Sequence, residues 1–171
     1  ARETAARFAA GAVAKQLLLL HNIEVRAYTV ALGGIKAKQR DLSLIDSNSY
    51  YCPDAEAAVQ MEQRVQEVRS QGDTLGGIVE IVASCPAGLG EPVFDKLEAE
   101  LAHGLMSIGA VKGVEVGAGF AAAEMLGSQN NDPIAPFGFL TNNAGGILAG
   151  LSNGAPLVIR VAVKPIPSIA R

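Results

Sequence analysis

The segment TAARFAAGAVAKQLLLL, at residues 4–20, is the most informative part of the chain for its architecture. Its alanine and leucine content predicts a helix, and Asn22 provides a signal for the end of that helix. Apolar residues lie on nearly every side of the expected helix, and such a helix is usually buried on more than one side. We therefore expect alanine-rich helices that are covered by sheet on two sides.

Two more helices are expected along the chain. One begins at Pro53–Asp54 and closes near Gly72, with its apolar residues at helical spacing. The other opens at residues 90–92 and places Phe94 on its buried face.

Strands separate these helices. Alternating or continuous apolar runs predict strands at residues 23–31, 78–83 and 111–116. Residues 147–151 and 157–163 resemble a hairpin that turns at Asn153–Gly154. The order of elements favours the α+β class, as a layered β-α-β sandwich with a largely antiparallel sheet. No linker is visible, so residues 1–171 are expected to form a single domain.

The composition is that of a folded globular protein, with 49% apolar and 18% charged residues. A net charge of −3 gives no argument for nucleic acid or an anionic membrane as a partner. Cys52 and Cys85 lie far apart, which favours a reduced, cytoplasmic protein over a disulfide scaffold. His21 and His103 have no partner at metal-ligand spacing, so no metal site is expected.

One uncharged stretch raises the question of a membrane span. No charged side chain occurs between Asp132 and Arg160. Prolines, asparagines and glycines interrupt this stretch, and a continuous spanning helix could not carry them. The chain also opens without a signal peptide, so no membrane association is expected.

Residues 117–122, GAGFAA, follow an expected strand and match a loose form of the dinucleotide-binding glycine pattern. The stretch before Gly127 is too short for a crossover helix, and no acidic residue follows at the usual spacing. A turn is the favoured interpretation, and a nucleotide-binding domain is the alternative.

Three other features could receive a ligand. Arg160 and Lys164 lie on one face of an expected strand and could meet an anion, although an ordinary solvent face is an equal alternative. Residues 164–168, KPIPS, form a rigid extended exit that could lie flat against a planar ligand or be a simple edge strand. In residues 141–146, TNNAGG, amides stand beside bare backbone, which suits a close ligand approach or a turn.

Several segments, taken together and in their order, resemble the chorismate synthase family. They are ARETAAR (1–7), GDTLGG (72–77) with Glu80, PAGLGEPVFDKL (86–97), AVKGVEVG (110–117), GSQN (127–130), TNNAGG (141–146) and KPIPSI (164–169). Each segment is weak alone, but the combination is specific and is spread over the whole chain.

The resemblance implies a lyase of the shikimate pathway of aromatic amino acid biosynthesis. Members of the family eliminate phosphate from 5-enolpyruvylshikimate 3-phosphate, in an anti-1,4 sense, to give chorismate. Reduced FMN is the implied cofactor although the reaction has no net redox change; NADP is associated with the family, and its members are homotetramers. The family's acid-base histidines belong to segments outside these 171 residues. No catalytic residue is therefore assigned here, and this fragment alone is expected to be inactive.

The resemblance also implies site residues. Flavin contacts fall on Gly109, Ala110, Ala149, Lys164, Pro165, Ile166, Pro167 and Ser168, with Asn142 as a weaker candidate. Arg2 is expected to bind the phosphate or a carboxylate of the substrate, because its planar fork can engage oxyanions. Ile166 and Pro167 stand where Thr and Ser are common in the family.

These residues are expected to converge on one bed for a flat ligand. The competing hypothesis is that the chain is a folding and oligomerisation core that binds no flavin.

Overall fold

The computed structural model describes residues 2–167 and 169, apart from the side chain of Arg2. The chain divides into two compact units. Unit 1 comprises Ala1–Arg26, Ile81–Ile108 and Glu115–Ile159, and unit 2 comprises Ala27–Glu80, Gly109–Val114 and Arg160–Arg171. The single-domain organisation stays a prediction.

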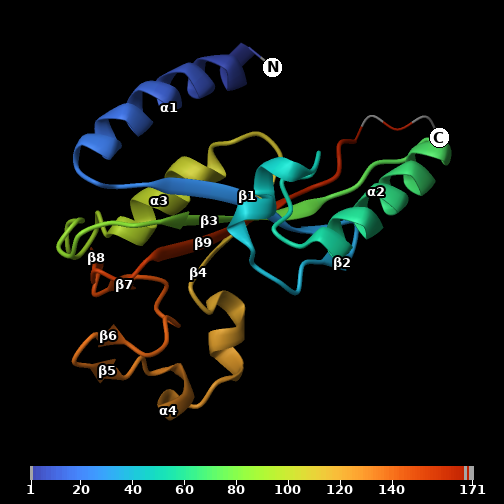
Figure 1. Cartoon of the computed structure of the whole chain (residues 1–171). Helices are drawn as coiled ribbons and strands as arrows, with labels where there is room; N and C mark the ends of the chain where they lie inside the picture. Colours follow the sequence, from blue (N-terminus) through green and yellow to red (C-terminus); the bar gives the residue numbers. More distant parts are fainter. Residues whose placement is uncertain (1, 168, 170–171) are drawn as a thin grey trace. The chain divides into compact units, whose positions relative to one another are not determined.

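The main sheet has five strands in the order β2-β1-β3-β9-β4 (Figure 1). They are β1 (Val25–Leu32), β2 (Ile35–Lys36), β3 (Gly77–Ala83), β4 (Val111–Val116) and β9 (Leu157–Val163). β1 and β2 pair antiparallel around Gly33 and Gly34, which have φ angles of 57° and 89°. Two consecutive positive φ angles are typical of a tight hairpin turn.

Buried and less buried side chains alternate along β9, as the sequence pattern predicted. Leu157, Ile159 and Val161 are buried, while the residues between them are half-buried or exposed. However, the predicted hairpin of residues 147–151 with 157–163 is wrong. β7 (Ile147–Leu148) pairs instead with β8 (Leu151–Ser152), because the chain already turns at residues 149–150.

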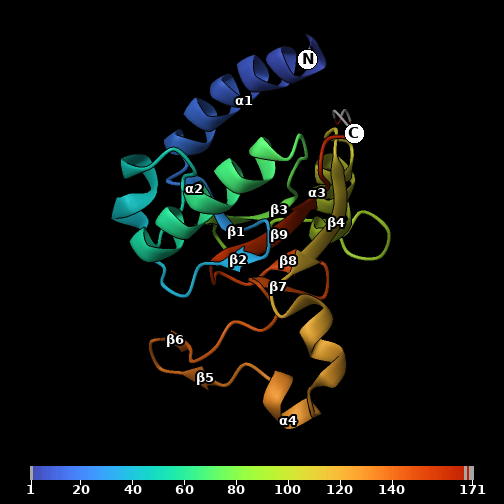
Figure 2. The same ribbon diagram turned by 90° about the vertical axis from the view of Figure 1, so that its right-hand side faces the viewer.

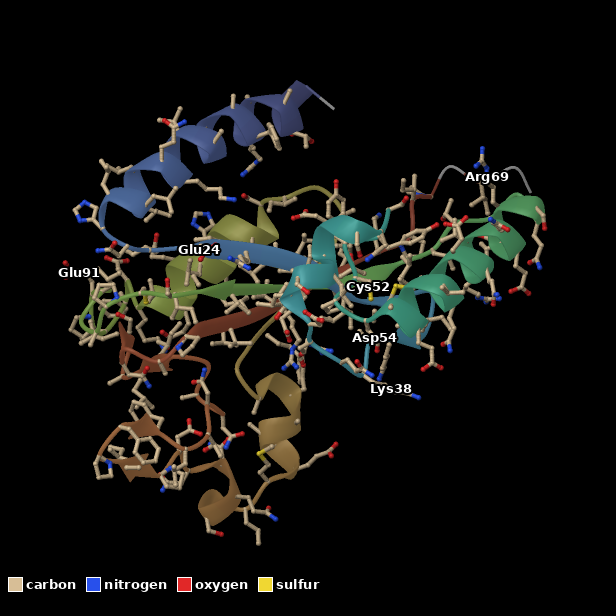
Figure 3. All side chains as sticks on the ribbon, viewed as in Figure 1. Glu24, Lys38, Cys52, Asp54, Arg69 and Glu91 are labelled. Atoms are coloured by element: carbon tan, nitrogen blue, oxygen red, sulfur yellow. The ribbon has the colours of Figure 1, made fainter. Side chains whose placement is uncertain are left out.

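Unit 2 is built on α2 (Ala55–Ser70), with η1 (Leu42–Ser47) before it. Asp54 caps α2 by accepting a hydrogen bond from Ala57 N at 3.1 Å, and it also accepts one from Lys38 N at 2.8 Å. These bonds, led by the one from Ala57, lower the pKa of Asp54. Figure 3 shows Lys38 and Asp54 beside the start of the helix. Met61 lies in the core with Ala57 and Ala58 and is fully buried.

Unit 1 contains α1 (Arg2–Leu20), α3 (Leu97–Met106), η2 (Gly119–Glu124), α4 (Gly127–Asn130), β5 (Ile134–Ala135) and β6 (Gly138–Phe139). β5 and β6 form an antiparallel hairpin. This hairpin and α4 lie together at one end of the unit, away from α1 (Figure 2). The core of the unit joins Ile23, Ala83, Cys85, Ile147 and Leu157.

The α+β class and antiparallel pairing are confirmed, but the burial expected of α1 is not found in this chain. Phe8 is 81% exposed and Leu20 is 78% exposed. The helix reaches the core of unit 1 through Leu18, which is only partly buried. Its end was predicted correctly, because Asn22 adopts a φ of 57° and its N–H bonds to Leu19 O at 3.0 Å.

The third helix begins later than its sequence suggested. α3 starts at Leu97, and residues 90–96 are irregular. Gly90 and Val93 have φ angles of 121° and 85°, which a right-handed helix excludes. Phe94 is consequently 87% exposed rather than on a buried face.

Candidate functional site

Ala110 and Lys164 meet in unit 2. Lys164 N donates a hydrogen bond to Ala110 O at 2.9 Å, which ties the residue after β9 to the residue before β4. Ala110 has a φ of 72°, a region that is costly for a residue with a Cβ. Gly109 is exposed, and nothing would lie within 4 Å of a Cβ added to it. The predicted contacts on these two segments are therefore brought together.

The segment after β9, residues 164–167, which we call the exit from β9, is also held by the GDTLGG segment. Thr74 Oγ1 donates a hydrogen bond to Ile166 O at 2.7 Å. A Cβ on Gly76 would lie 2.8 Å from Val163 O and 3.0 Å from a side-chain atom of Pro165. The GDTLGG segment therefore needs glycine at residue 76, because the exit of β9 packs against its bare backbone.

The exit presents a cation beside apolar side chains. Lys164, Pro165, Ile166 and Pro167 are all exposed, and Ile166 is 63% exposed. The two prolines have no N–H, and the N–H of Lys164 is already used within the chain. The exit therefore offers a ligand an ammonium group next to apolar surface, and this combination suits a flat ring that carries an anionic group.

Ala149 lies in unit 1, in the turn between β7 and β8. Its φ is 52° and that of Gly150 is 85°, which makes a two-residue turn of the type that favours hairpins. Ala149 is exposed, and Gly150 packs against Lys96. Among the described residues, Ala110 and Ala149 are two of the five non-glycine residues with positive φ.

Asn142 also lies in unit 1, but its side chain is engaged by the protein itself. Its Oδ1 accepts from Gly146 N at 2.8 Å, and its Nδ2 donates to Pro156 O at 2.8 Å. Asn142 also lines a hollow of about 540 Å³ that includes Phe137 and Phe139. The residues lining this hollow carry no charge, so they offer no cation for a phosphate.

The loop of residues 141–146 packs directly on the glycine-rich turn after β4. Ala118 N donates to Asn143 O at 2.8 Å, and Gly117 N donates to Val158 O at 2.9 Å. A Cβ on Gly117 would overlap Asn143 O. The GAGFAA and TNNAGG segments thus form one structure, and the glycines permit their close approach.

This arrangement argues against the dinucleotide alternative. The backbone N–H groups of Gly117, Ala118, Phe120 and Ala121 all bond within the chain. The segment that follows is a 3₁₀-helix, Gly119–Glu124, rather than a long helix that could face a pyrophosphate. The glycines make a turn, as the favoured interpretation predicted.

Asp132, which no sequence pattern singled out, organises the same loop. Its carboxylate accepts from Thr141 Oγ1 at 2.6 Å, Asn143 N at 2.7 Å and Ala144 N at 2.8 Å. Asp132 is the only charged residue between Glu124 and Arg160 in the sequence, and this isolation was the available signal.

Comparison with known proteins gives the family. The model of the family described as chorismate synthase matches residues 1–171. The chain belongs to the chorismate synthase family. A chorismate synthase of Syntrophobacter fumaroxidans is 62% identical over 171 residues, which cover 99% of this chain and 49% of that protein. One of Desulfatibacillum aliphaticivorans is 61% identical over 171 residues, covering 99% of this chain and 48% of that protein.

A solved structure agrees with the sequence relatives. A crystal structure of chorismate synthase matches with a TM-score of 0.88 at 34% identity, over 97% of this chain and 56% of that chain. The chain thus spans about half the length of the curated chorismate synthases it matches. Among the described residues, no helix is both long enough and apolar enough to cross a membrane.

The remaining residues inferred from the chorismate synthase resemblance are less well placed. The side chain of Arg2 and all of Ser168 lie outside the described residues. Arg160 is half-buried within β9, whereas Lys164 is exposed and follows the end of that strand. Gly109, Ala110 and Lys164–Pro167 lie in unit 2, while Asn142 and Ala149 lie in unit 1. Their convergence on one bed stays a prediction.

Proposed function

We propose that a protein carrying this chain is a chorismate synthase. It eliminates phosphate from 5-enolpyruvylshikimate 3-phosphate, in an anti-1,4 sense, to give chorismate. The observation that carries this proposal is the family match along all 171 residues. We also propose that the full-length protein is active as a homotetramer in the cytoplasm.

Reduced FMN is the proposed cofactor, and the exposed exit from β9 supports it. Bound reduced FMN would supply transient electron donation to the substrate and accept its proton. Lys164 would place a cation against an anionic part of the flavin, and Pro165–Pro167 would offer apolar surface to the ring. Ser168, Asn142, Gly109, Ala110 and Ala149 are proposed to complete the flavin contacts.

Left-handed backbone at two of these positions also supports a ligand site. Ala110 and Ala149 hold φ angles of 72° and 52°, each at a cost of order 1–3 kcal/mol. Strained residues of this kind are enriched at ligand-binding sites. Arg2 is proposed to bind an anionic group of the substrate.

The direct test is chorismate formation by the full-length protein with reduced FMN under anaerobic conditions. We expect turnover in the unaltered protein and a loss of FMN affinity of roughly tenfold or more in Lys164→Ala, because a charged contact is removed. Lys36→Ala, an exposed lysine in β2, is the matched control and should bind FMN normally. Equal affinity in both variants would contradict the role given to Lys164.

The alternative is a scaffold that folds and assembles without binding flavin. Titration of FMN into the 171-residue chain separates the two, because a scaffold gives no change in flavin fluorescence. Mass measurement of the full-length protein in solution tests the tetramer, and a monomer would contradict that part of the proposal.

A further inference from the structure

A single carboxylate anchors the loop that carries Asn142. Asp132 Oδ1 accepts from Thr141 Oγ1 at 2.6 Å and from Asn143 N at 2.7 Å, and Oδ2 accepts from Ala144 N at 2.8 Å. These donors stand on both sides of Asn142. We propose that Asp132 is a positioning residue that sets the backbone of residues 141–144 for the flavin site, and its effect on flavin rests on the proposed function above.

An ionised acid matches the chemistry of the three donors. One hydroxyl and two backbone N–H groups all point at this side chain, and a carboxylate can accept from all three without donating. An asparagine would turn an NH₂ group toward at least one of the donors. Burial by itself raises the pKa of Asp132, but the bonds from Thr141, Ala144 and Asn143 outweigh it and hold the pKa below its ordinary value.

Further hydrogen bonds connect the residues that Asp132 holds to the rest of the loop. Asn142 bonds to Gly146 N and Pro156 O, and Asn143 O accepts from Ala118 N at 2.8 Å. Asn143 Nδ2 also donates to Gln129 O at 3.2 Å. Loss of the carboxylate would therefore release the backbone amides of Asn143 and Ala144, which directly follow Asn142 in the loop.

Asp132 also joins this loop to the β5–β6 hairpin. The hairpin lies between Asp132 and Thr141, and Leu140 N donates to Pro133 O at 2.9 Å at its base. The hairpin is exposed, since Phe137 at its tip is 85% exposed and Ile134 in β5 is 77% exposed. The bond between Asp132 and Thr141 therefore closes the base of an exposed hairpin and holds the loop at the same time.

The test compares Asp132→Asn, Asp132→Glu and the control Glu124→Gln in the full-length protein. Glu124 is an exposed carboxylate in the same unit, and its change is the same acid-to-amide replacement. In Asp132→Asn, hydrogen exchange at Asn143 and Ala144 should rise by roughly 10- to 100-fold, because bonds to a charged acceptor are lost. FMN affinity should fall by about tenfold in protein that is still folded at the assay temperature, with partial recovery in Asp132→Glu.

Three outcomes overturn parts of the proposal. Unchanged exchange at Asn143 and Ala144 would show that Asp132 does not anchor the loop. Raised exchange with normal FMN affinity and turnover would remove its positioning role. If the unaltered protein neither binds FMN nor forms chorismate, the proposed function fails, while the exchange measurement still decides the anchoring.

Thr141→Val removes one donor to Asp132 and replaces Asp132→Asn as the test variant if Asp132→Asn does not fold. A smaller rise in hydrogen exchange at Asn143 is then expected.

Discussion

Among single residues, Glu80 is a buried charged group in unit 2. It is 8% exposed and accepts from Tyr28 Oη at 2.8 Å and from Arg40 Nε at 3.2 Å. A buried carboxylate is tolerated because a hydroxyl and a guanidinium both donate to it. Burial, followed by the hydrogen bond to Glu80, raises the pKa of Tyr28 to about 12.

Replacing Tyr28 with Phe should therefore destabilise the protein by about 1.5–3 kcal/mol near pH 7, because a hydrogen bond to a charged group is lost. The folded pKa of Tyr28 lies above its ordinary value of 10.0, so its stabilising effect is complete below pH 10 and is lost toward pH 12. Urea unfolding of both proteins at several pH values measures this. A constant difference between pH 8 and pH 12 would contradict it. Tyr51→Phe is the control, because Tyr51 is 58% exposed.

At the scale of elements, the chain after β9 shows how a segment without regular structure is held in place. Lys164 N bonds to Ala110 O, and Ile166 O accepts from Thr74 Oγ1. The first bond fixes the backbone at Lys164, and the second fixes it two residues later at Ile166. Gly76 has no Cβ, so the backbone of the GDTLGG segment can lie close to Val163 and Pro165.

Thr74→Val should loosen this exit and weaken FMN binding by roughly three- to tenfold, because one neutral hydrogen bond is worth about 1 kcal/mol. Thr74→Ser keeps the hydroxyl and should bind FMN almost normally. Flavin fluorescence titration of the full-length variants gives both affinities. If Val and Ser at this position behave alike, the hydroxyl does not position the exit.

For the whole molecule, each unit has its own core. Unit 2 packs Ala37, Cys52, Ala57 and Ala58 around Met61, and unit 1 packs a separate cluster around Ile147. The core of unit 2 uses small side chains around Met61, which agrees with a chain in which aromatic residues make up only 5%. Small side chains cannot move to fill a large cavity, so truncation of a large central side chain should strongly lower the free energy of unfolding.

Met61→Ala should destabilise the protein by about 2–5 kcal/mol, because a fully buried side chain leaves a cavity. Val59→Ala is the matched control in the same helix, since Val59 is 60% exposed, and it should change stability by less than about 0.5 kcal/mol. Urea unfolding monitored by circular dichroism measures both. Similar losses in the two variants would show that Met61 is not central to the core.

Local patterns were sufficient for several elements and for part of the site. The bounds of β4, the end of α1 at Asn22 and the alternation of β9 follow from residue spacing and turn chemistry, which depend only on neighbours in the chain. The resemblance to the family selected Ala110 and Ala149 without showing why alanine stands there.

The folded chain alone revealed the remaining features. Pairing of β7 with β8, the exposure of α1 and the left-handed backbone of the two alanines depend on contacts that local spacing does not encode. Asp132 is the clearest case, since its donors lie 9 to 12 residues away along the chain. Hydrogen bonds of this kind form only after the backbone has turned back on itself, because their geometry is set by tertiary packing rather than by sequence period.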